Sequence, residues 1–296
     1  MTKPVLIVVV TYNAMQWIDR CLVSAVGSAS ADTLVVDNAS TDGTAEYVAE
    51  HYPTVKLVAR KDNPGFGASN NIGLSAVLTQ GYRYAYLLNQ DAWLEEGTIE
   101  TLVAAMELDP RYGILSPVQR SADGKLDRRF EAKCGSFLDK ASGTVEVPFV
   151  MAAHWLVSSR AIRAVGGFSP TFRQYGEDDN YIDRLHHRGL LCGVVTSASA
   201  VHDRAQRPED KLKRMRLKCI AVEVRLSNPT YGFALRRLLA PLELIGMSIK
   251  NLSAVPLRYI PVLRGRLPII RENRRRSLSE SAFLSLEQAE NGSAGA

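Results

Sequence analysis

The sequence predicts an α/β fold in which a mostly parallel sheet is flanked by helices on both faces. Four short runs rich in Val, Leu and Tyr alternate with stretches whose apolar residues recur at helical spacing. This alternation is typical of parallel sheets, because each helix returns the chain to the same edge of the sheet. Polar residues directly follow the runs. Because open α/β sheets bind ligands at the carboxyl ends of their strands, Thr11, Asp37, Asn63 and Asp91 are expected to converge on one crevice.

The elements follow in order along the chain. The runs expected to form strands are residues 5–10, 34–36, 55–59 and 84–88. The stretches expected to form helices are residues 15–25, 41–52, 68–78 and 98–108, the second with Ser40 and Thr41 as N-cap candidates and the last ending before Pro110. The pattern is irregular beyond Pro117, and apolar order returns at 148–157. A helix is expected near 178–188 and a strand near 193–195.

The C-terminal part of the chain is basic. Residues 206–276 are expected to form two or three amphipathic helices broken at Pro229, Pro256 and Pro261, and residues 277–296 a flexible tail. The segment from Pro241 to Leu263 is apolar and lies between basic stretches, which suits a helix lying on an anionic membrane surface. It also suits a helical cap packed on the rest of the chain. No nucleic-acid partner is expected, because no recognition motif is present.

Composition sets the class of protein. The 296 residues are 46% hydrophobic and 23% charged with a formal charge of +5, which suits one large globular domain with an appendage. The four cysteines are scattered without a CxxC pair, which favours reduced thiols in a cytoplasmic chain. No apolar run reaches the length of about 18 residues that a membrane-spanning helix needs.

Four segments at strand ends carry a resemblance to a known family. They read VVTYN at 9–13, VVDNASTDGT at 35–44, NPGFGASNNIG at 63–73 and LLNQDA at 87–92. In this order and spacing, over roughly the first two hundred residues, they resemble the family 2 glycosyltransferases of GT-A fold, in particular the rhamnosyltransferase-like members. The resemblance implies a domain over 1–205, with a nucleotide-sugar-binding half at 1–116 and an acceptor and catalytic half at 117–205.

The first half is expected to bind the donor. The residues that the resemblance assigns to the donor are Thr11, Tyr12, Asn13, Asp37, Asn38, Gly67, Asn70, Asn71, Asn89 and Gln90. An acid at a strand end, such as Asp37, can accept a hydrogen bond from a base imide or a ribose hydroxyl, but it can equally cap the turn before Ser40. Gly65 and Gly67 begin like a dinucleotide-binding fingerprint, but Gly73 lies too far along to complete it.

Asp91 is the candidate metal ligand. A sugar diphosphate accumulates charge as its bond to the anomeric carbon breaks, and Mg²⁺ or Mn²⁺ held by a carboxylate can neutralise it. The family usually has an Asp-x-Asp motif here, whereas this chain reads Asn89-Gln90-Asp91 and keeps only the last acid. The resemblance adds His202 as a second ligand. A lone histidine is otherwise more often a structural hydrogen-bonding residue.

The second half is expected to hold the catalytic base and the acceptor. Glu177, Asp178 and Asp179 open a helix, where three acids would also complement the helix dipole. The resemblance makes Asp178 the base that deprotonates the acceptor hydroxyl, with Asp179 as the alternative. The candidates for contact with the acceptor are His154, Trp155 and Tyr175, although the first two could equally be core residues.

These features predict a metal-dependent, inverting glycosyltransferase. It would move a sugar from a nucleoside diphosphate donor, such as dTDP-rhamnose or a UDP-hexose, to a hydroxyl of a glycan or lipid-linked acceptor in cell-surface polysaccharide synthesis. We expect it to be peripheral on the inner face of the cell membrane. The alternatives are a sugar nucleotidyltransferase, and a degenerate, non-catalytic relative that acts in membrane assembly.

Overall fold

The computed structural model describes residues 3–138, 142–204 and 210–286. The strands in these residues are β1 (Val5–Thr11), β2 (Ala31–Asp37), β3 (Lys56–Ala59), β4 (Tyr84–Asn89), β5 (Ala92–Leu94), β6 (Tyr112–Arg120), β7 (Thr144–Glu146), β8 (His154–Ser158) and β9 (Leu191–His202). The helices are α1 (Ile18–Val26), α2 (Thr44–His51), α3 (Phe66–Thr79), α4 (Thr98–Leu108), α5 (Arg128–Leu138), α6 (Ser159–Val165), α7 (Glu177–His187), α8 (Lys211–Ser227), α9 (Phe233–Asn251) and α10 (Val255–Arg276).

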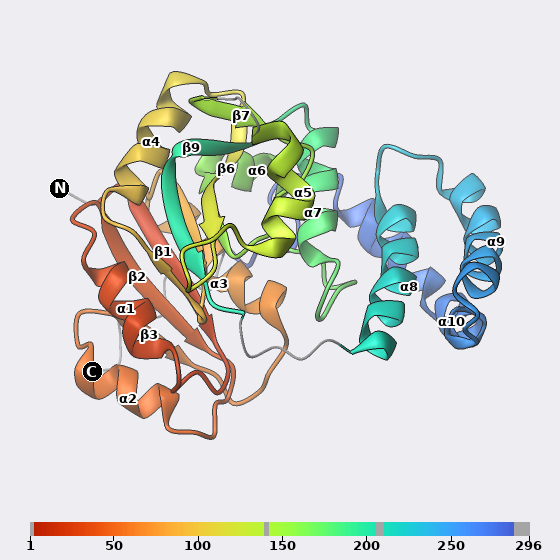
Figure 1. Cartoon of the computed structure of the whole chain (residues 1–296), viewed down its shortest axis with the longest axis horizontal. Coiled ribbons are helices and arrows are strands. Elements are labelled where there is room, and N and C mark those ends of the chain that lie inside the picture. Colours follow the sequence, from red (N-terminus) through yellow and green to blue (C-terminus); the bar gives the residue numbers. More distant parts are fainter. Residues whose placement is uncertain (1–2, 139–141, 205–209, 287–296) are drawn as a thin grey trace.

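All of these strands belong to one sheet, shown in Figure 1. Their order is β3-β2-β1-β4-β8-β6-β9-β5, with β7 beside β9. The first four strands are parallel, as predicted. The second half adds antiparallel pairs at β4 with β8, β6 with β8 and β9 with β5, so the sheet as a whole is mixed rather than mostly parallel.

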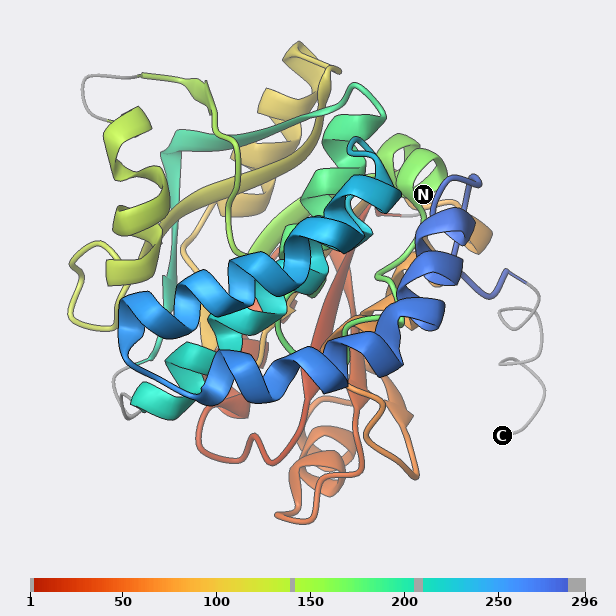
Figure 2. The same ribbon diagram turned by 90° about the vertical axis from the view of Figure 1, so that its right-hand side faces the viewer.

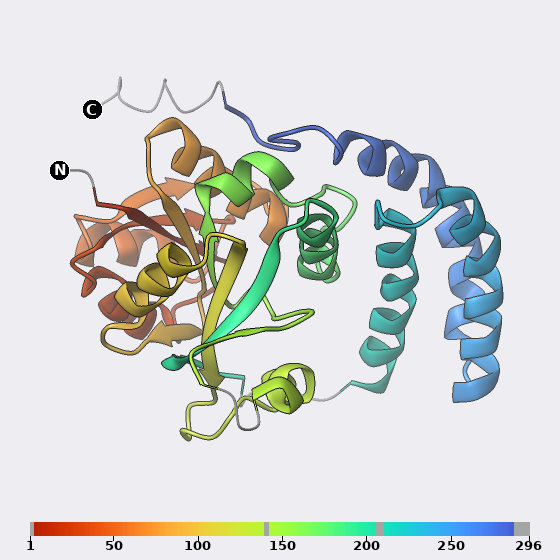
Figure 3. The ribbon, with the colours of Figure 1, turned by 90° about the horizontal axis from the view of Figure 1, so that it is seen from above.

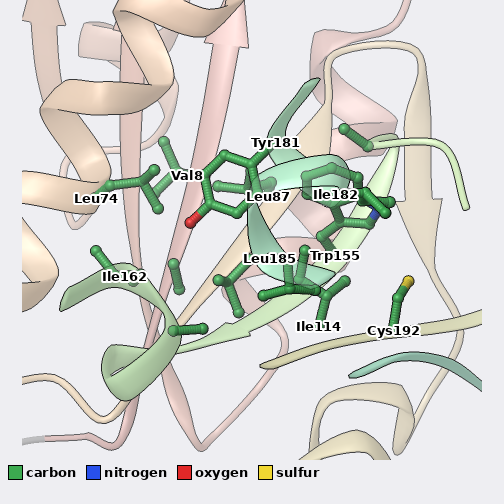
Figure 4. Packing of buried hydrophobic residues seen from close by; sticks show 14 of the residues in the cluster. Val8, Leu74, Leu87, Ile114, Trp155, Ile162, Tyr181, Ile182, Leu185 and Cys192 are labelled. Carbon is green, nitrogen blue, oxygen red and sulfur yellow. The ribbon is translucent and has the colours of Figure 1, made fainter. Parts of the chain in front are cut away.

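Helices cover both faces of the sheet, and β1 shows why its sequence suits a central strand. Leu6, Val8 and Val10 are buried in a core shared with α3, α6 and α7. Ile7 and Val9 point to the opposite face and are buried with α1 and α4. Successive side chains of a strand alternate between faces, so a continuous apolar run is buried on both. Figure 4 shows the first of these cores, with Val8 and Leu74 near Leu87.

Two local expectations are wrong. The region after Pro117 is not irregular throughout, because β6 continues to Arg120 and α5 follows. The register of β6 against β9 shifts between Pro117 and Val118, and such an irregularity accommodates a proline that has no N–H to donate. Neither Ser40 nor Thr41 caps α2, because the helix begins after Gly43, at Thr44, and Ser40 is hydrogen bonded to Asp37.

The three C-terminal helices form a bundle with its own core, beside the sheet domain (Figures 1 and 2). Pro229 lies between α8 and α9, and Pro256 lies in the first turn of α10, as predicted for helix boundaries. Pro261 does not break α10, which continues to Arg276. Its side chain is exposed, so water can replace the hydrogen bond that the proline removes. Among the described residues, no helix is long and apolar enough to cross a membrane.

The segment after α10 returns to the sheet domain, as Figure 3 shows. The backbone N–H of Ser281 donates to the Arg163 carbonyl, and that of Gly167 donates to the Ala282 carbonyl. A flexible tail is therefore wrong for residues 277–286, and residues 287–296 lie outside the described part. The four cysteines, all of them described, are buried and form no disulfide.

Candidate active site

A cavity of about 630 Å³ lies at the carboxyl ends of the first parallel strands. The residues predicted to bind the donor or the metal that line this cavity are Thr11, Tyr12, Asn38, Asn89, Gln90 and Asp91. Asn63 also lines it, so most of the strand ends that we expected to converge do so. They come from β1, β2 and β4 and from the loops that follow, which confirms the strand-end argument.

Asp37 is the exception among these strand ends. It is buried, and its carboxylate accepts hydrogen bonds from the hydroxyls of Thr11 (2.7 Å) and Ser40 (2.5 Å) and from the Ser40 backbone N–H (2.9 Å). Asp37 does not line the cavity. Its structural role is therefore to cap the turn after β2 and to orient Thr11, which does face the cavity.

Other predicted donor residues hold the loops around the cavity together. The side-chain amide of Gln90 is paired with the backbone of Tyr12, accepting from its N–H (2.7 Å) and donating to its carbonyl (3.2 Å). The side-chain oxygen of Asn13 accepts from the backbone N–H of Thr41. Asn38 accepts a hydrogen bond from the Ser69 hydroxyl, which ties the end of β2 to α3.

The Gly-rich segment lines the cavity at Asn63, Gly65 and Phe66, and its other residues pack against the second half of the domain. A Cβ on Gly67 would lie 2.7 Å from Phe168 Cβ, and one on Gly65, whose φ is +99°, would overlap the Arg173 carbonyl. Asn70 donates to the Phe66 carbonyl within its own helix. Asn71 accepts from the backbone N–H of Phe168 and donates to its carbonyl. Gly67, Asn70 and Asn71 do not line the cavity, and the donor contacts predicted for them stay a prediction.

Asp91 lines the cavity, and its carboxylate contacts His202, which does not line it. Both side chains are buried, and Asp91 Oδ1 lies 3.2 Å from His202 Nε2. Asn89 Oδ1, from another cavity residue, is buried without a hydrogen-bond partner among the described residues. Asn89 and Asp91 thus line the cavity, and the His202 imidazole lies next to Asp91, although no three His, Cys, Asp or Glu side chains in the described chain form a metal-binding cluster.

The three acids at the start of α7 differ in their surroundings. Burial, together with the neighbouring Asp179, raises the pKa of Asp178 to about 6, although its carboxylate accepts hydrogen bonds from the backbone N–H groups of Asp179 and Ala152. Burial raises the pKa of Glu177 too, and its Oε2 is buried without a partner among the described residues. Asp178 connects to the cavity through Ala152, because the next residue, Ala153, accepts from the backbone N–H of Asn89 (3.1 Å).

His154 and Trp155 are core residues, so the acceptor role predicted for them is wrong. Both are fully buried. His154 lies between the Tyr86 hydroxyl (3.0 Å) and the Val201 carbonyl (3.1 Å), and burial with His202 nearby lowers its pKa to about 3, so its ring is neutral. The Trp155 indole donates to the Val150 carbonyl. Tyr175, the third acceptor candidate, does line the cavity.

The sequence from residue 6 to residue 166 matches Glycosyl transferase family 2. This match spans more than half of the chain. The chain belongs to this family, and it is a glycosyltransferase. It is 27% identical over 238 residues to the N-acetylglucosaminyl-diphospho-decaprenol L-rhamnosyltransferase of Mycobacterium tuberculosis, a match that covers 69% of this chain and 78% of the relative.

Solved structures confirm the GT-A fold of this glycosyltransferase. The mannosyltransferase PcManGT from Pyrobaculum calidifontis, in complex with GDP-Man and Mn²⁺, is 19% identical with a TM-score of 0.58, covering 95% of this chain and 84% of that chain. The 1–349 fragment of S. aureus TarS in complex with UDP-GlcNAc is 13% identical with a TM-score of 0.58, and the match covers 93% of this chain and 83% of that chain. At these identities the likeness concerns the fold alone.

The glycosyltransferase cavity has a second wall, of which the sequence predicted only Tyr175. It consists of the loop before α7 and of residues on two C-terminal helices: Thr171, Phe172, Arg173, Gln174, Tyr175, Ile220, Glu223, Tyr259 and Arg266. All of them lie beyond residue 166, where the family match ends. One signal was available, since Glu223 is the single acid in the strongly basic helix α8, and such an acid is buried only when it is paired.

Proposed function

We propose that this glycosyltransferase transfers a sugar, with inversion, from a nucleoside diphosphate donor of the dTDP-rhamnose or UDP-hexose type to a hydroxyl of a glycan or lipid-linked acceptor. The observation that carries the proposal is the cavity lined by Asp91. The carboxyl group of Asp178, whose pKa is raised, lies next to the backbone of Ala152 and Ala153, and that backbone is hydrogen bonded to the cavity residue Asn89. The relative from M. tuberculosis, a rhamnosyltransferase named for a diphospho-decaprenol acceptor, supports the choice of substrates.

Asp91 and His202 are the proposed ligands of a divalent metal. Ligands about 2.1 Å from Mg²⁺ or Mn²⁺ at right angles lie about 3 Å from each other, and Asp91 Oδ1 and His202 Nε2 are 3.2 Å apart. Asn89 Oδ1, which has no hydrogen-bond partner among the described residues, is a third candidate ligand atom. These groups fit a cation that takes its other ligands from water and phosphate, and such a cation would neutralise charge on the leaving diphosphate. The Mn²⁺-bound mannosyltransferase supports this choice of metal.

Asp178 is the proposed general base. A base must be ionised at the working pH yet basic enough to take a proton, and a carboxyl whose pKa is raised to about 6 meets both conditions near neutral pH. Burial raises the pKa of Asp179 too, but the nearby Lys133 ammonium group and a hydrogen bond with Asp178 oppose this rise, so Asp179 is the alternative base. Glu177, whose pKa is raised further, would be largely protonated and would not serve as a base at neutral pH.

The test is hydrolysis of dTDP-rhamnose, UDP-galactose and UDP-glucose by the purified chain with Mn²⁺, Mg²⁺ or a chelator. We expect slow, metal-dependent release of nucleoside diphosphate from one of these donors. A sugar nucleotidyltransferase would instead form a nucleotide sugar from a nucleoside triphosphate and a sugar phosphate. Absence of both reactions and of nucleotide binding would favour the non-catalytic alternative.

The C-terminal bundle is proposed to dock on an anionic membrane surface. Helix α9 carries an apolar row that we call the α9 stripe: Leu235, Leu238, Leu242, Ile245 and Ile249, continued by Leu252. These side chains are 39–95% exposed. The chain has 36 basic and 31 acidic residues, and residues 211–276 contain sixteen of the basic and three of the acidic ones. The formal charge of the bundle is therefore +13, and that of the rest of the chain is −8. An exposed apolar row on such a basic bundle fits a negatively charged leaflet.

A further inference from the structure

The wall of the cavity beyond the strand ends carries aromatic and charged side chains. Tyr175 lies beside the Lys213 ammonium group, which is 5.1 Å from the centre of its ring. Arg173 lines the same wall and donates from Nη2 to the Asn63 carbonyl (2.8 Å), so the loop before α7 reaches across to the opposite side. Tyr259 and Arg266 come from α10 and complete the wall.

A buried carboxylate fixes the α10 residues of this wall. Glu223 is 1% exposed, and its Oε1 accepts a hydrogen bond from the Tyr259 hydroxyl (2.6 Å). Its Oε2 accepts from Arg266 Nε (3.0 Å) and lies 2.9 Å from Arg266 Nη2. Arg266 Nη2 also donates to the Thr171 carbonyl. Because no described residue accepts a hydrogen bond from Arg266 Nη1 and the side chain is partly exposed, this nitrogen can serve a ligand in the cavity.

The same wall is built against the start of α7. Gly176, the residue before that helix, has a φ of +88°, and a Cβ there would lie 2.9 Å from Ile220 Cγ2 and 3.0 Å from Val224 Cγ2. Helix α8 therefore packs directly on the turn that leads to Asp178. A group bound against Ile220 and Glu223 of α8 would therefore lie near the start of α7, which carries the proposed base.

We propose that this second wall is a subsite for a glycosyl phosphate, the phosphate-bearing end of the acceptor. Arg266 supplies the cation for the phosphate, Glu223 is the positioning residue that holds it, and Tyr175 and Tyr259 flank the sugar. The assignment rests on the proposed transfer function. Inversion supports it, because the acceptor hydroxyl must approach from the face opposite the leaving diphosphate, and the strand ends with Asp91 occupy that diphosphate's side. Guanidinium groups suit phosphate, and aromatic faces suit sugar rings.

The first test uses the unaltered chain and calorimetry with N-acetylglucosamine 1-phosphate, glucose 1-phosphate, the two free sugars and inorganic phosphate. At least one sugar phosphate should bind more tightly than its free sugar and than phosphate. Its affinity should be retained when the protein is saturated with UDP or dTDP and Mn²⁺. Displacement by the nucleotide would show that Arg266 serves the donor diphosphate, and failure of both sugar phosphates to bind would also overturn the subsite. Failure of the nucleotides to bind would instead count against the proposed function.

The second test removes the cation together with its partner, so that no buried charge is left unpaired. The double variant Glu223→Gln/Arg266→Gln should bind the sugar phosphate at least about tenfold more weakly, the scale of one charge-assisted hydrogen bond, with nucleotide affinity unchanged. The matched control is Arg225→Gln/Glu243→Gln, an ion pair of 2.6 Å between α8 and α9 that does not line the cavity. If the affinities for the sugar phosphate and for the nucleotide fall equally in the double variant, or if neither falls, the wall is a structural support and not a subsite.

Discussion

Replacing Asp178 by Asn should make the protein more stable at pH 8 while removing most of its activity. Burial and the Asp179 charge raise the pKa of Asp178 from 3.8 to about 6. An acid whose pKa is higher in the folded chain opposes folding once it ionises, so the cost is absent below about pH 4 and complete above about pH 6. At about 1.4 kcal/mol per pH unit this cost is about 3 kcal/mol.

The amide keeps the shape of the carboxyl group but accepts fewer hydrogen bonds. Losing one of the two backbone hydrogen bonds costs about 1 kcal/mol, which leaves a net gain of about 2 kcal/mol at pH 8. Urea unfolding of both proteins at pH 4 and pH 8 measures this gain, which should vanish at the lower pH. A variant less stable than the wild type at pH 8, or an equal gain at both pH values, would refute the reasoning.

The same variant tests the chemistry. Donor binding should be nearly unchanged, while the transfer rate falls by about 10²–10⁴-fold, the usual contribution of a general base. In the wild type, transfer should fall as the pH drops through about 6, because Asp178 becomes protonated. Asp179→Asn is the control, and it should retain activity. If Asp179→Asn is inactive and Asp178→Asn is not, the base is one residue further along, and if both are active, it lies outside α7.

Three further predictions follow from the site, the bundle and the core. Asp91→Ala should abolish the Mn²⁺ dependence of nucleoside diphosphate binding in calorimetry, and equal metal-dependent affinity in both proteins would contradict the metal assignment. The chain should sediment with anionic vesicles at low salt and be released as salt rises, because exposed charges are screened over about 8–10 Å near physiological ionic strength. Serine substitutions in the α9 stripe should prevent sedimentation with the vesicles. The control Leu108→Ser, at an 87% exposed position on α4, should sediment like the wild type. Equal sedimentation of the two variants would show that the stripe is not the membrane contact. Gly73→Ala should destabilise the fold by about 1–3 kcal/mol in urea unfolding, because its Cβ would overlap both methyl groups of Val8. Gly246→Ala, with open space around it, should be neutral or slightly stabilising, and the reverse order would contradict this packing argument.

The sequence was most informative where the structure is determined locally. The helix predicted at 98–108 has those bounds, and the first four strands lie where the apolar runs predicted them. Apolar periodicity reports which faces are buried, and parallel strands place their carboxyl ends together. For this reason the sequence alone was enough to assign Thr11, Asn63 and Asp91 to one cavity.

The sequence was least informative where a role depends on a distant partner. Asn71 and Gly67 look like residues of a ligand-binding loop, but their contacts are with Phe168, about a hundred residues away. Aromatic side chains such as Trp155 often stack on sugars in binding sites. The strand that carries Trp155 lies in the middle of the sheet, however, and its side chain is buried. Arg266 and Glu223 are 43 residues apart on two amphipathic helices, where charged residues are normally solvated. Only the packing of the bundle on the α7 loop identifies them.

The return of residues 277–286 to the sheet domain means that the bundle is attached at both of its ends. The chain enters it after β9, and beyond α10 it is held again by the hydrogen bonds of Ser281 and Ala282. If the contacts at one end open, the other end keeps the bundle at a high effective concentration, in the millimolar range for short flexible connections, so reclosure is fast. A single proteolytic cut within the bundle would leave its N-terminal part joined to the sheet domain by the chain, and its C-terminal part held by the contacts of Ser281 and Ala282 and by packing within the bundle. A truncation anywhere in the bundle would remove this second attachment.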